Sequence, residues 1–164
     1  MTKYCVNAVY GTVDNKSTLE AEDDAASVNW GGAWRMPTKE EFQELVDNCY
    51  WVWTNSYNGT STSGYIVYKA KSLSDKGQVV TSYKTPSSNY SLSDTHIFLP
   101  AAGYYFDSSS YKMGLQGFYW SSSLHYTNHL ACLLELEPNS NYRIVYVTAY
   151  LRSLGKSVRA VCKK

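Results

Sequence analysis

The sequence predicts an α+β domain with two helices near its start and antiparallel strands after them. The chain has 164 residues, of which 44% are hydrophobic and 18% charged, a composition typical of globular domains that bury a core. Helical spacing of apolar residues is confined to the first 50 residues. Helices first and strands later is the α+β pattern. We expect one domain over residues 1–164, whether the chain stands alone or belongs to a longer protein.

Both predicted helices have recognisable starts. The first opens at Ser17-Thr18-Leu19-Glu20 and runs through an Ala-rich stretch to Val28, with acidic residues near its positive end. The second begins with a capping box, in which Thr38 is followed three residues later by Glu41. Apolar residues then recur at helical spacing and predict one buried stripe: Phe42, Leu45, Val46 and Cys49.

Beyond residue 50 the chain reads as short strands separated by turns. The expected strands are 50–54, 65–70, 97–100, 118–122, 130–136, 142–151 and 157–162. Residues 71–95 are rich in Lys, Ser and Thr, which predicts a long surface excursion with at most a weak hairpin at Lys76-Gly77. A loop punctuated by Gly103, Gly114 and Gly117 precedes the late strands.

The strand expected over 142–151 is the most informative stretch, because its two faces differ. Side chains alternate between the faces of a strand. The odd positions form an aliphatic core face: Val145, Val147, Ala149 and Leu151. The even positions form what we call the even face: Tyr142, Ile144, Tyr146, Thr148 and Tyr150. A row of rings opposite the core is either covered by other parts of the chain or contacts a ligand.

Tyrosine is the unusual residue of the composition, with 16 Tyr against 4 Phe. A buried Tyr must find a partner for its hydroxyl group, so an excess of Tyr over Phe favours surface rings. Tyr with Ser, Asn and Gly is typical of recognition surfaces. Tyr also favours strands, so a β-rich domain accounts for the same count. Both interpretations stay open at this point.

Charge and hydropathy exclude two classes of partner. The net charge is +1, which excludes a broad electrostatic footprint for nucleic acid or an anionic membrane. No apolar run approaches the roughly 18 residues that span a bilayer, so no membrane insertion is expected. The start, Met1-Thr2-Lys3-Tyr4-Cys5, lacks the apolar stretch of a signal peptide. Either the protein is made without one, or the chain is a fragment whose leader was removed.

No motif in the chain predicts catalysis or a cofactor. The four cysteines lie far apart without a C-x-x-C pair, so they are free thiols or form one or two bridges. His125-x-x-x-His129 has the spacing of a metal pair, but it needs a helix and here follows a strand, so surface recognition is favoured. No Ser/His/Asp order, phosphate loop or paired carboxylate motif is present. The protein is therefore expected not to be an enzyme.

Tryptophans and arginines are expected to serve structure. Arg35 and Arg159 lie beside apolar residues, and we expect each to pair with a carboxylate or with backbone carbonyl groups. The tryptophans are expected in the core: Trp30, Trp34, Trp51, Trp53 and Trp120.

Several blocks resemble a known family. They are Trp30-Gly31-Gly32-Ala33-Trp34-Arg35-Met36-Pro37-Thr38-Lys39-Glu40-Glu41-Phe42, Ile97-Phe98-Leu99-Pro100-Ala101-Ala102-Gly103-Tyr104, Gly117-Phe118-Tyr119-Trp120-Ser121-Ser122-Ser123 and Gly155-Lys156-Ser157-Val158-Arg159-Ala160-Val161. In this order they resemble the Fibrobacter succinogenes major paralogous domain, which is similar to C-type lectin-like domains and to formylglycine-generating enzymes. The resemblance implies a C-type lectin-like fold, with two helices and a twisted antiparallel sheet whose late strands and loops bind ligands. It also implies that Cys5 lies within bridging distance of Cys49.

Many members of this family resemble the variable proteins of diversity-generating retroelements. Those systems randomise template adenines, so that AAY codons become NNY and Asn often stands at alternating late positions. On this chain those positions are 144, 146, 148 and 150, which belong to the even face; the chain carries Ile, Tyr, Thr and Tyr there, as a diversified copy would. Residues 121–132 and 140–155 contain no Lys, Glu, Gln, Trp or Met, which NNY codons cannot encode. Strand composition also depletes Lys and Glu.

The resemblance raises two further activities, calcium-dependent sugar binding and the oxidation that formylglycine-generating enzymes carry out. Glu137-Pro138-Asn139 matches the triplet with which many calcium-dependent lectins hold calcium and sugar, but the partner Trp-Asn-Asp is absent and a turn is favoured. The oxidases would need two cysteines a few residues apart, and Cys132 and Cys162 are much further apart.

The leading hypothesis is a non-enzymatic recognition or adhesion domain with a diversified, Tyr-rich face. Its ligand is expected to be a protein or glycan on another cell or particle, which places the domain outside the cell, on a cell surface or on a phage. The expected contact residues are His125, Tyr126, Asn128, His129, Asn141, Tyr142, Ile144, Tyr146, Thr148, Tyr150 and Ser153. The alternatives are a calcium-dependent carbohydrate-binding module built on Glu137 and Asn139, and a static structural or adhesive surface subunit.

Overall fold

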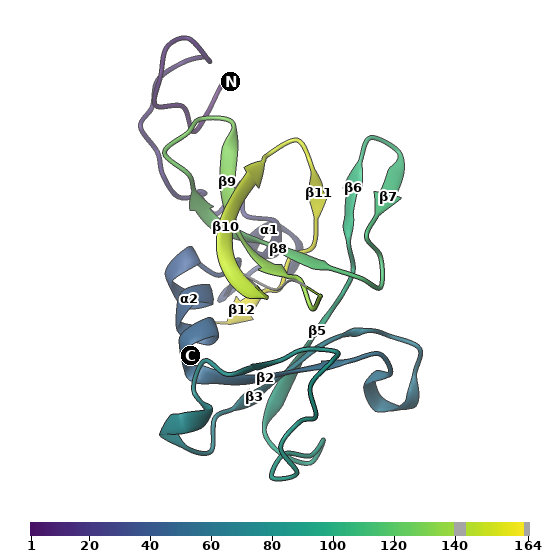
Figure 1. Ribbon diagram of the computed structural model, residues 1–164. Helices are drawn as coiled ribbons and strands as arrows, with labels where there is room; N and C mark the ends of the chain where they lie inside the picture. The colour runs from purple at the N-terminus through teal and green to yellow at the C-terminus, as the bar shows by residue number, and fades with distance from the viewer. Residues whose placement is uncertain (140–143, 163–164) are drawn as a thin grey trace.

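The computed structural model describes residues 1–139 and 144–162, and they form a mixed α+β fold (Figure 1). The described part has two α-helices, α1 (Ala25–Trp30) and α2 (Lys39–Asn48), and two short 3-10 helices, η1 (Tyr57–Gly59) and η2 (Leu73–Asp75). Its strands are β1 (Trp34–Arg35), β2 (Cys49–Thr54), β3 (Gly64–Lys69), β4 (Val79–Val80), β5 (His96–Pro100), β6 (Tyr104–Phe106), β7 (Ser109–Tyr111), β8 (Gly117–Leu124), β9 (Leu130–Leu136), β10 (Val145–Leu151), β11 (Gly155–Lys156) and β12 (Val161–Cys162).

Helix α2 confirms the predicted capping box. The Thr38 hydroxyl accepts a hydrogen bond from the Glu41 amide at 3.2 Å, and the Glu41 carboxylate accepts one from the Thr38 amide at 2.9 Å. Phe42 is buried in the core, and the other members of the predicted stripe pack against it, half-buried: Leu45, Val46 and Cys49. The same Glu41 carboxylate binds the Arg35 guanidinium, which confirms the expected pairing of this arginine.

Helix α1 is shorter than predicted and starts later, at Ala25. The Asp24 carboxylate caps it by accepting from the amides of Ala26 and Ser27, both at 2.9 Å. The residues expected to form its first turns are not helical: Thr18 bridges to Ser123 of β8, and residues 21–23 form a separate turn. The predicted start at residue 17 was wrong because β8 supplies backbone partners that compete with a helical turn.

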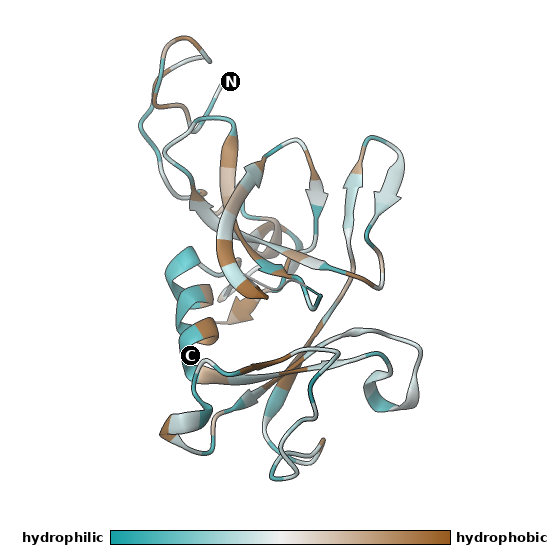
Figure 2. Ribbon diagram, viewed as in Figure 1, coloured by the Kyte–Doolittle hydropathy of each residue, from teal (hydrophilic) through white to brown (hydrophobic). Residues whose placement is uncertain are grey.

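Two sheets enclose the main core. One has the order β4-β2-β3-β5 and the other the order β10-β9-β8. Between them, with α2 on one side, lies a cluster of buried side chains that includes Trp51, Tyr65, Leu99, Leu134 and Leu136. Figure 2 shows the apolar residues of β5, β9, β10 and the inner side of α2 converging on this region. All the strands expected from residue 50 to residue 151 are present, with small differences at their ends.

Two local elements were not predicted. Strand β4 lies in the 71–95 excursion and pairs in parallel with β2, with Val79 opposite Trp51 and Val80 opposite Val52. The hairpin of β6 and β7 occupies the expected glycine-rich loop, and most of its residues are exposed. Neither element shows a clear alternation of apolar residues in the sequence. Strand β4 is only two residues long, and the hairpin of β6 and β7 buries little surface.

The last segment of the chain is not the single strand expected over 157–162. Strand β11 pairs with β6, Ser157 bridges in parallel to Tyr119, and β12 pairs antiparallel with β1, with Trp34 opposite Cys162. Residues 155–162 therefore contact three separate elements. No helix in the described part of the chain is both long and apolar enough to span a bilayer.

Two expectations about single residue types were wrong. Trp51 and Trp53 are buried as expected, but Trp30 and Trp34 are 59% and 44% exposed. The Cys5 Sγ atom lies 3.1 Å from the Asn7 carbonyl oxygen and 3.6 Å from the Asn128 amide nitrogen, and none of the four cysteines forms a disulfide bond. The N-terminal segment packs against the loop after β8, which keeps Cys5 away from the bridge that the family resemblance implied.

Candidate functional site

Strand β10 has two faces, as the sequence predicted, but Leu151, which was expected on the core face, is 45% exposed. Val145 is buried in the main core, and Val147 packs against that core. The opposite face carries Tyr146, Thr148 and Tyr150, which stand beside Glu135, Leu133 and Ala131 of β9. The even face therefore continues across the sheet, onto β9 and β8.

A hollow of about 310 Å³ opens on this face. Its walls include four aromatic rings, those of Tyr104, Phe118, Tyr146 and Tyr150. Two charged side chains, Glu135 and Lys156, line it as well. The hollow is therefore made by β6, β8, β9, β10 and β11 together, and its volume is at the lower end of the range for ligand pockets.

Lys156 places its ammonium group among aromatic rings. The Lys156 Nζ atom lies 4.0 Å from the ring centroid of Phe118, 4.4 Å from Tyr150, 4.8 Å from Tyr104 and 5.5 Å from Trp120. This Nζ atom is buried and has no hydrogen-bond partner among the described residues. Burial lowers the pKa of Lys156 to about 8, and the Glu135 carboxylate partly opposes that shift. Ring faces attract a cation, so this arrangement holds the ammonium group without a polar partner.

Glu135 is the second buried charge of the hollow, with only 3% of the residue exposed. Burial raises its pKa, and hydrogen bonding to the Tyr146 and Tyr150 hydroxyl groups acts in the opposite direction. Its Oε2 atom has no hydrogen-bond partner in the described part of the chain. A buried acceptor without a partner is uncommon in folded proteins and indicates a position that water or a ligand group satisfies.

The lining of the hollow includes Glu137, one of the two residues of the calcium-dependent alternative. Glu137 accepts a hydrogen bond from Gln116 at 2.7 Å through Oε1, and both residues line the hollow. Asn139 accepts one from the Ser82 hydroxyl at 2.9 Å through Oδ1. The two oxygens named for the calcium-dependent alternative are thus both engaged within the chain.

The expected contact residues fall into separate groups. Tyr146 and Tyr150 line the hollow, Thr148 lies between them, and Ser153 is exposed after β10. Ile144 precedes the strand and packs against the main core, so its assignment to the even face was wrong. Asn141 and Tyr142 lie outside the described residues.

The loop after β8 carries the remaining expected contacts, beyond the Leu151 end of β10. Tyr126 is 83% exposed and packs on His125, and the His129 ring lies 6.0 Å from that of Tyr10. Asn128 is buried, and its Oδ1 accepts the Val6 amide at 2.9 Å. The prediction of Asn128 as a contact residue was wrong, because its side chain anchors the N-terminal segment.

Sequence reasoning missed the charged pair of the hollow. Glu135 is the one acidic residue in the otherwise apolar strand Leu130–Leu136, and such an isolated charge is a usable signal. Lys156 follows Gly155 in a two-residue strand, which is too short to show a pattern of its own. Only the pairing of β11 with β6 brings it to the even face.

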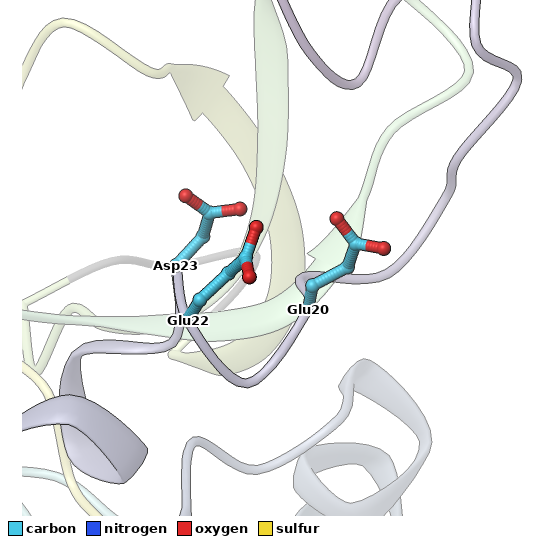
Figure 3. A group of neighbouring side chains, drawn as sticks. All are labelled: Glu20, Glu22 and Asp23. Atoms are coloured by element: carbon cyan, nitrogen blue, oxygen red, sulfur yellow. The ribbon is translucent and has the colours of Figure 1, made fainter.

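A second group of titratable side chains lies near the N-terminus. Figure 3 shows the carboxylates of Glu20, Glu22 and Asp23, the one group of three His, Cys, Asp or Glu residues with metal-binding spacing in the described part of the chain. Lys3 bridges them: its Nζ lies 3.7 Å from Glu20 and 2.8 Å from Asp23, and it also bonds Glu22. Lys3, together with Lys16 on Glu20, therefore partly neutralises this cluster from within the chain.

Comparison of the chain with protein-family models, with curated proteins and with solved structures gives no match.

Proposed function

We propose that the chain is a non-enzymatic recognition domain whose ligand contacts the even face of β10 around the Glu135–Lys156 hollow. The observation that carries this proposal is the hollow itself, an aromatic-walled depression with two buried charges beside half-exposed tyrosines. Tyrosine rings supply contact area with little loss of side-chain entropy. Lys156 contacts the ring faces, and Glu135 accepts hydrogen bonds from the Tyr146 and Tyr150 hydroxyl groups. These contacts hold the rings in place, so the face is pre-organised for binding.

The proposal includes a C-type lectin-like architecture. Its supports are the order of the elements, helices before strands, and the pairing of late β12 with early β1 (Figure 1). The late strands β8, β9 and β10 then form the sheet that carries the binding face.

We also propose that positions 144, 146, 148 and 150 are diversified by a retroelement, which the gene sequence tests. Three of these positions lie on the even face, and Ile144 packs against the main core. If residues 144, 146, 148 and 150 derive from AAY codons, their codons all end in a pyrimidine. Tyr has no other codons, so Ile144, Thr148 and Ser153 are the informative positions. Purine-ending codons at Ile144 and Thr148 would remove diversification from the proposal, while a fixed binding face would remain.

Binding is tested with the fluorescently labelled chain on a panel of bacterial cells and on an immobilised glycan array. Tyr150→Ala removes a ring from the hollow, and Thr148→Lys adds bulk and charge to the same face. We expect both variants to lose binding while keeping the wild-type melting temperature within a few degrees.

Tyr83→Ala is the matched control, because Tyr83 is an exposed tyrosine in the 71–95 excursion. It should bind as the wild type does. Binding that survives both even-face variants, or an absence of binding in every assay, would count against the proposed function.

A further inference from the structure

Two departures from the sequence expectations meet at one place in the fold. Trp30 and Trp34 are exposed instead of buried, and their rings lie 6.0 Å apart at 65°. Arg159 is exposed as well, and within residues 1–139 and 144–162 no carboxylate pairs with it as Glu41 pairs with Arg35. All three line one hollow of about 530 Å³, whose other lining residues are Val158 and Ala160.

Three backbone segments form this hollow: the end of α1, strand β1 and residues 158–160. Trp30 is the last residue of α1, and Gly31 and Gly32 follow with φ of 62° and 59°. This left-handed pair, which glycine adopts without strain, reverses the chain so that the Trp34 amide bonds the Gly31 carbonyl at 3.2 Å. Pairing of β1 with β12 then brings residues 158–160 to the same place.

The chemistry of the lining selects the ligand. Two indole rings and two aliphatic side chains form apolar walls that take a flat apolar group. The guanidinium of Arg159 has no hydrogen bond or ion pair in the described part of the chain, and a guanidinium binds a carboxylate through two parallel hydrogen bonds. The volume lies within the range of small-molecule pockets.

We propose that the Trp30–Trp34–Arg159 hollow is a second binding site, which takes an organic anion with a flat apolar body. The apolar body packs on the indole rings and the anionic group binds the guanidinium. This site shares no lining residue with the Glu135–Lys156 hollow, so either can fail without affecting the other.

The test uses 2-naphthoate, with its neutral counterpart 2-naphthamide as the charge control. Indole N–H resonances of the isotope-labelled chain are followed by NMR, and Trp30→Phe and Trp34→Phe assign the two signals. We expect 2-naphthoate to shift the signals of Trp30 and Trp34 while those of buried Trp51 and Trp53 stay in place. The affinity for 2-naphthamide should be at least about tenfold lower than that for 2-naphthoate, because the amide loses one charge-assisted hydrogen bond to the guanidinium.

Arg159→Gln should lower the affinity for 2-naphthoate to that for the amide and leave the affinity for the amide unchanged. Lys84→Gln, which removes an exposed cation in the 71–95 excursion, should change neither affinity. Equal affinities for acid and amide in the wild type, or no shift of the two signals, would overturn the proposal. Shifts of the same signals on concentrating the chain without ligand would also overturn it, in favour of self-association.

Discussion

Lys156 carries the clearest pH dependence of any single residue in the hollow. Its native pKa is about 8, below its ordinary value of 10.5, because burial disfavours the charged form. Between these values the unfolded chain binds more protons than the native one, so the free energy of unfolding rises as the pH increases. Below about pH 8 both states are protonated and this gain is absent.

We therefore expect the free energy of unfolding of the wild type, relative to Lys156→Met, to increase from about pH 8 to pH 10. Urea unfolding at several pH values measures the difference, and Glu135, Tyr104 and Tyr150 remain in both proteins. A difference that stays flat over this range would mean that the four rings offset the burial of the ammonium group completely.

Asn128 gives the second prediction at this scale. Its buried amide accepts from Val6 and lies within hydrogen-bond distance of the Asn7 carbonyl oxygen, so it ties the N-terminal segment to the loop after β8. Asn128→Ala should lower the free energy of unfolding by about 1–3 kcal/mol, because it leaves buried polar groups unpaired. Tyr126→Ala, two residues away and exposed, should change it by less than about 0.5 kcal/mol. Equal effects of the two variants would contradict the assigned role.

Single residues mark the limit of what the sequence predicts about the site. Alternation along one strand is enough to assign Tyr146 and Tyr150 to the face opposite the core. It does not reveal that Glu135 stands beside Tyr146, because that depends on the register between β9 and β10. The prediction for Asn128 was wrong because it grouped this residue with Tyr126 and His129, which are exposed. The local sequence does not show whether a single polar residue in a loop is buried.

The N-cap side chains of the two helices accept hydrogen bonds from different numbers of backbone amides. Thr38 caps α2 through one amide, whereas Asp24 caps α1 through two amides and also accepts from the Met36 amide at 2.8 Å. Asp24→Ala should therefore lower the free energy of unfolding more than Thr38→Ala, by over 2 kcal/mol against about 1 kcal/mol. Chemical denaturation compares the two, with exposed Lys39→Ala as the control. A larger effect of Thr38→Ala would contradict this ranking.

The elements that were predicted well are those with strong local signals. The capping box and the apolar stripe define α2 to within a residue, and the late strands follow from their apolar runs. Helix α1 was misplaced because Ser17-Thr18 resembles a cap while its backbone pairs with β8. Strand β4 and the hairpin of β6 and β7 depend on partners distant in sequence, which local patterns do not contain.

At the scale of the whole molecule, calcium is expected to be dispensable. A ligand that binds only the native state raises the melting temperature. The Glu137 and Asn139 oxygens already accept hydrogen bonds, and Lys3 occupies the acidic cluster. The melting temperature should therefore not change when EDTA or millimolar calcium chloride is added. A rise with calcium would favour the calcium-dependent carbohydrate-binding module.

The pairing of β1 with β12 also sets the order in which the molecule can form. Residues 34–35 and 161–162 stand near opposite ends of the sequence, and closing so long a loop is entropically unfavourable until other contacts hold its ends together. On the ribosome, β1 has no strand partner among the described residues until residues 161–162 emerge, so this sheet forms only after residues 36–160 have been synthesised. Folding is accordingly expected to be slow, in the range typical of proteins dominated by distant contacts.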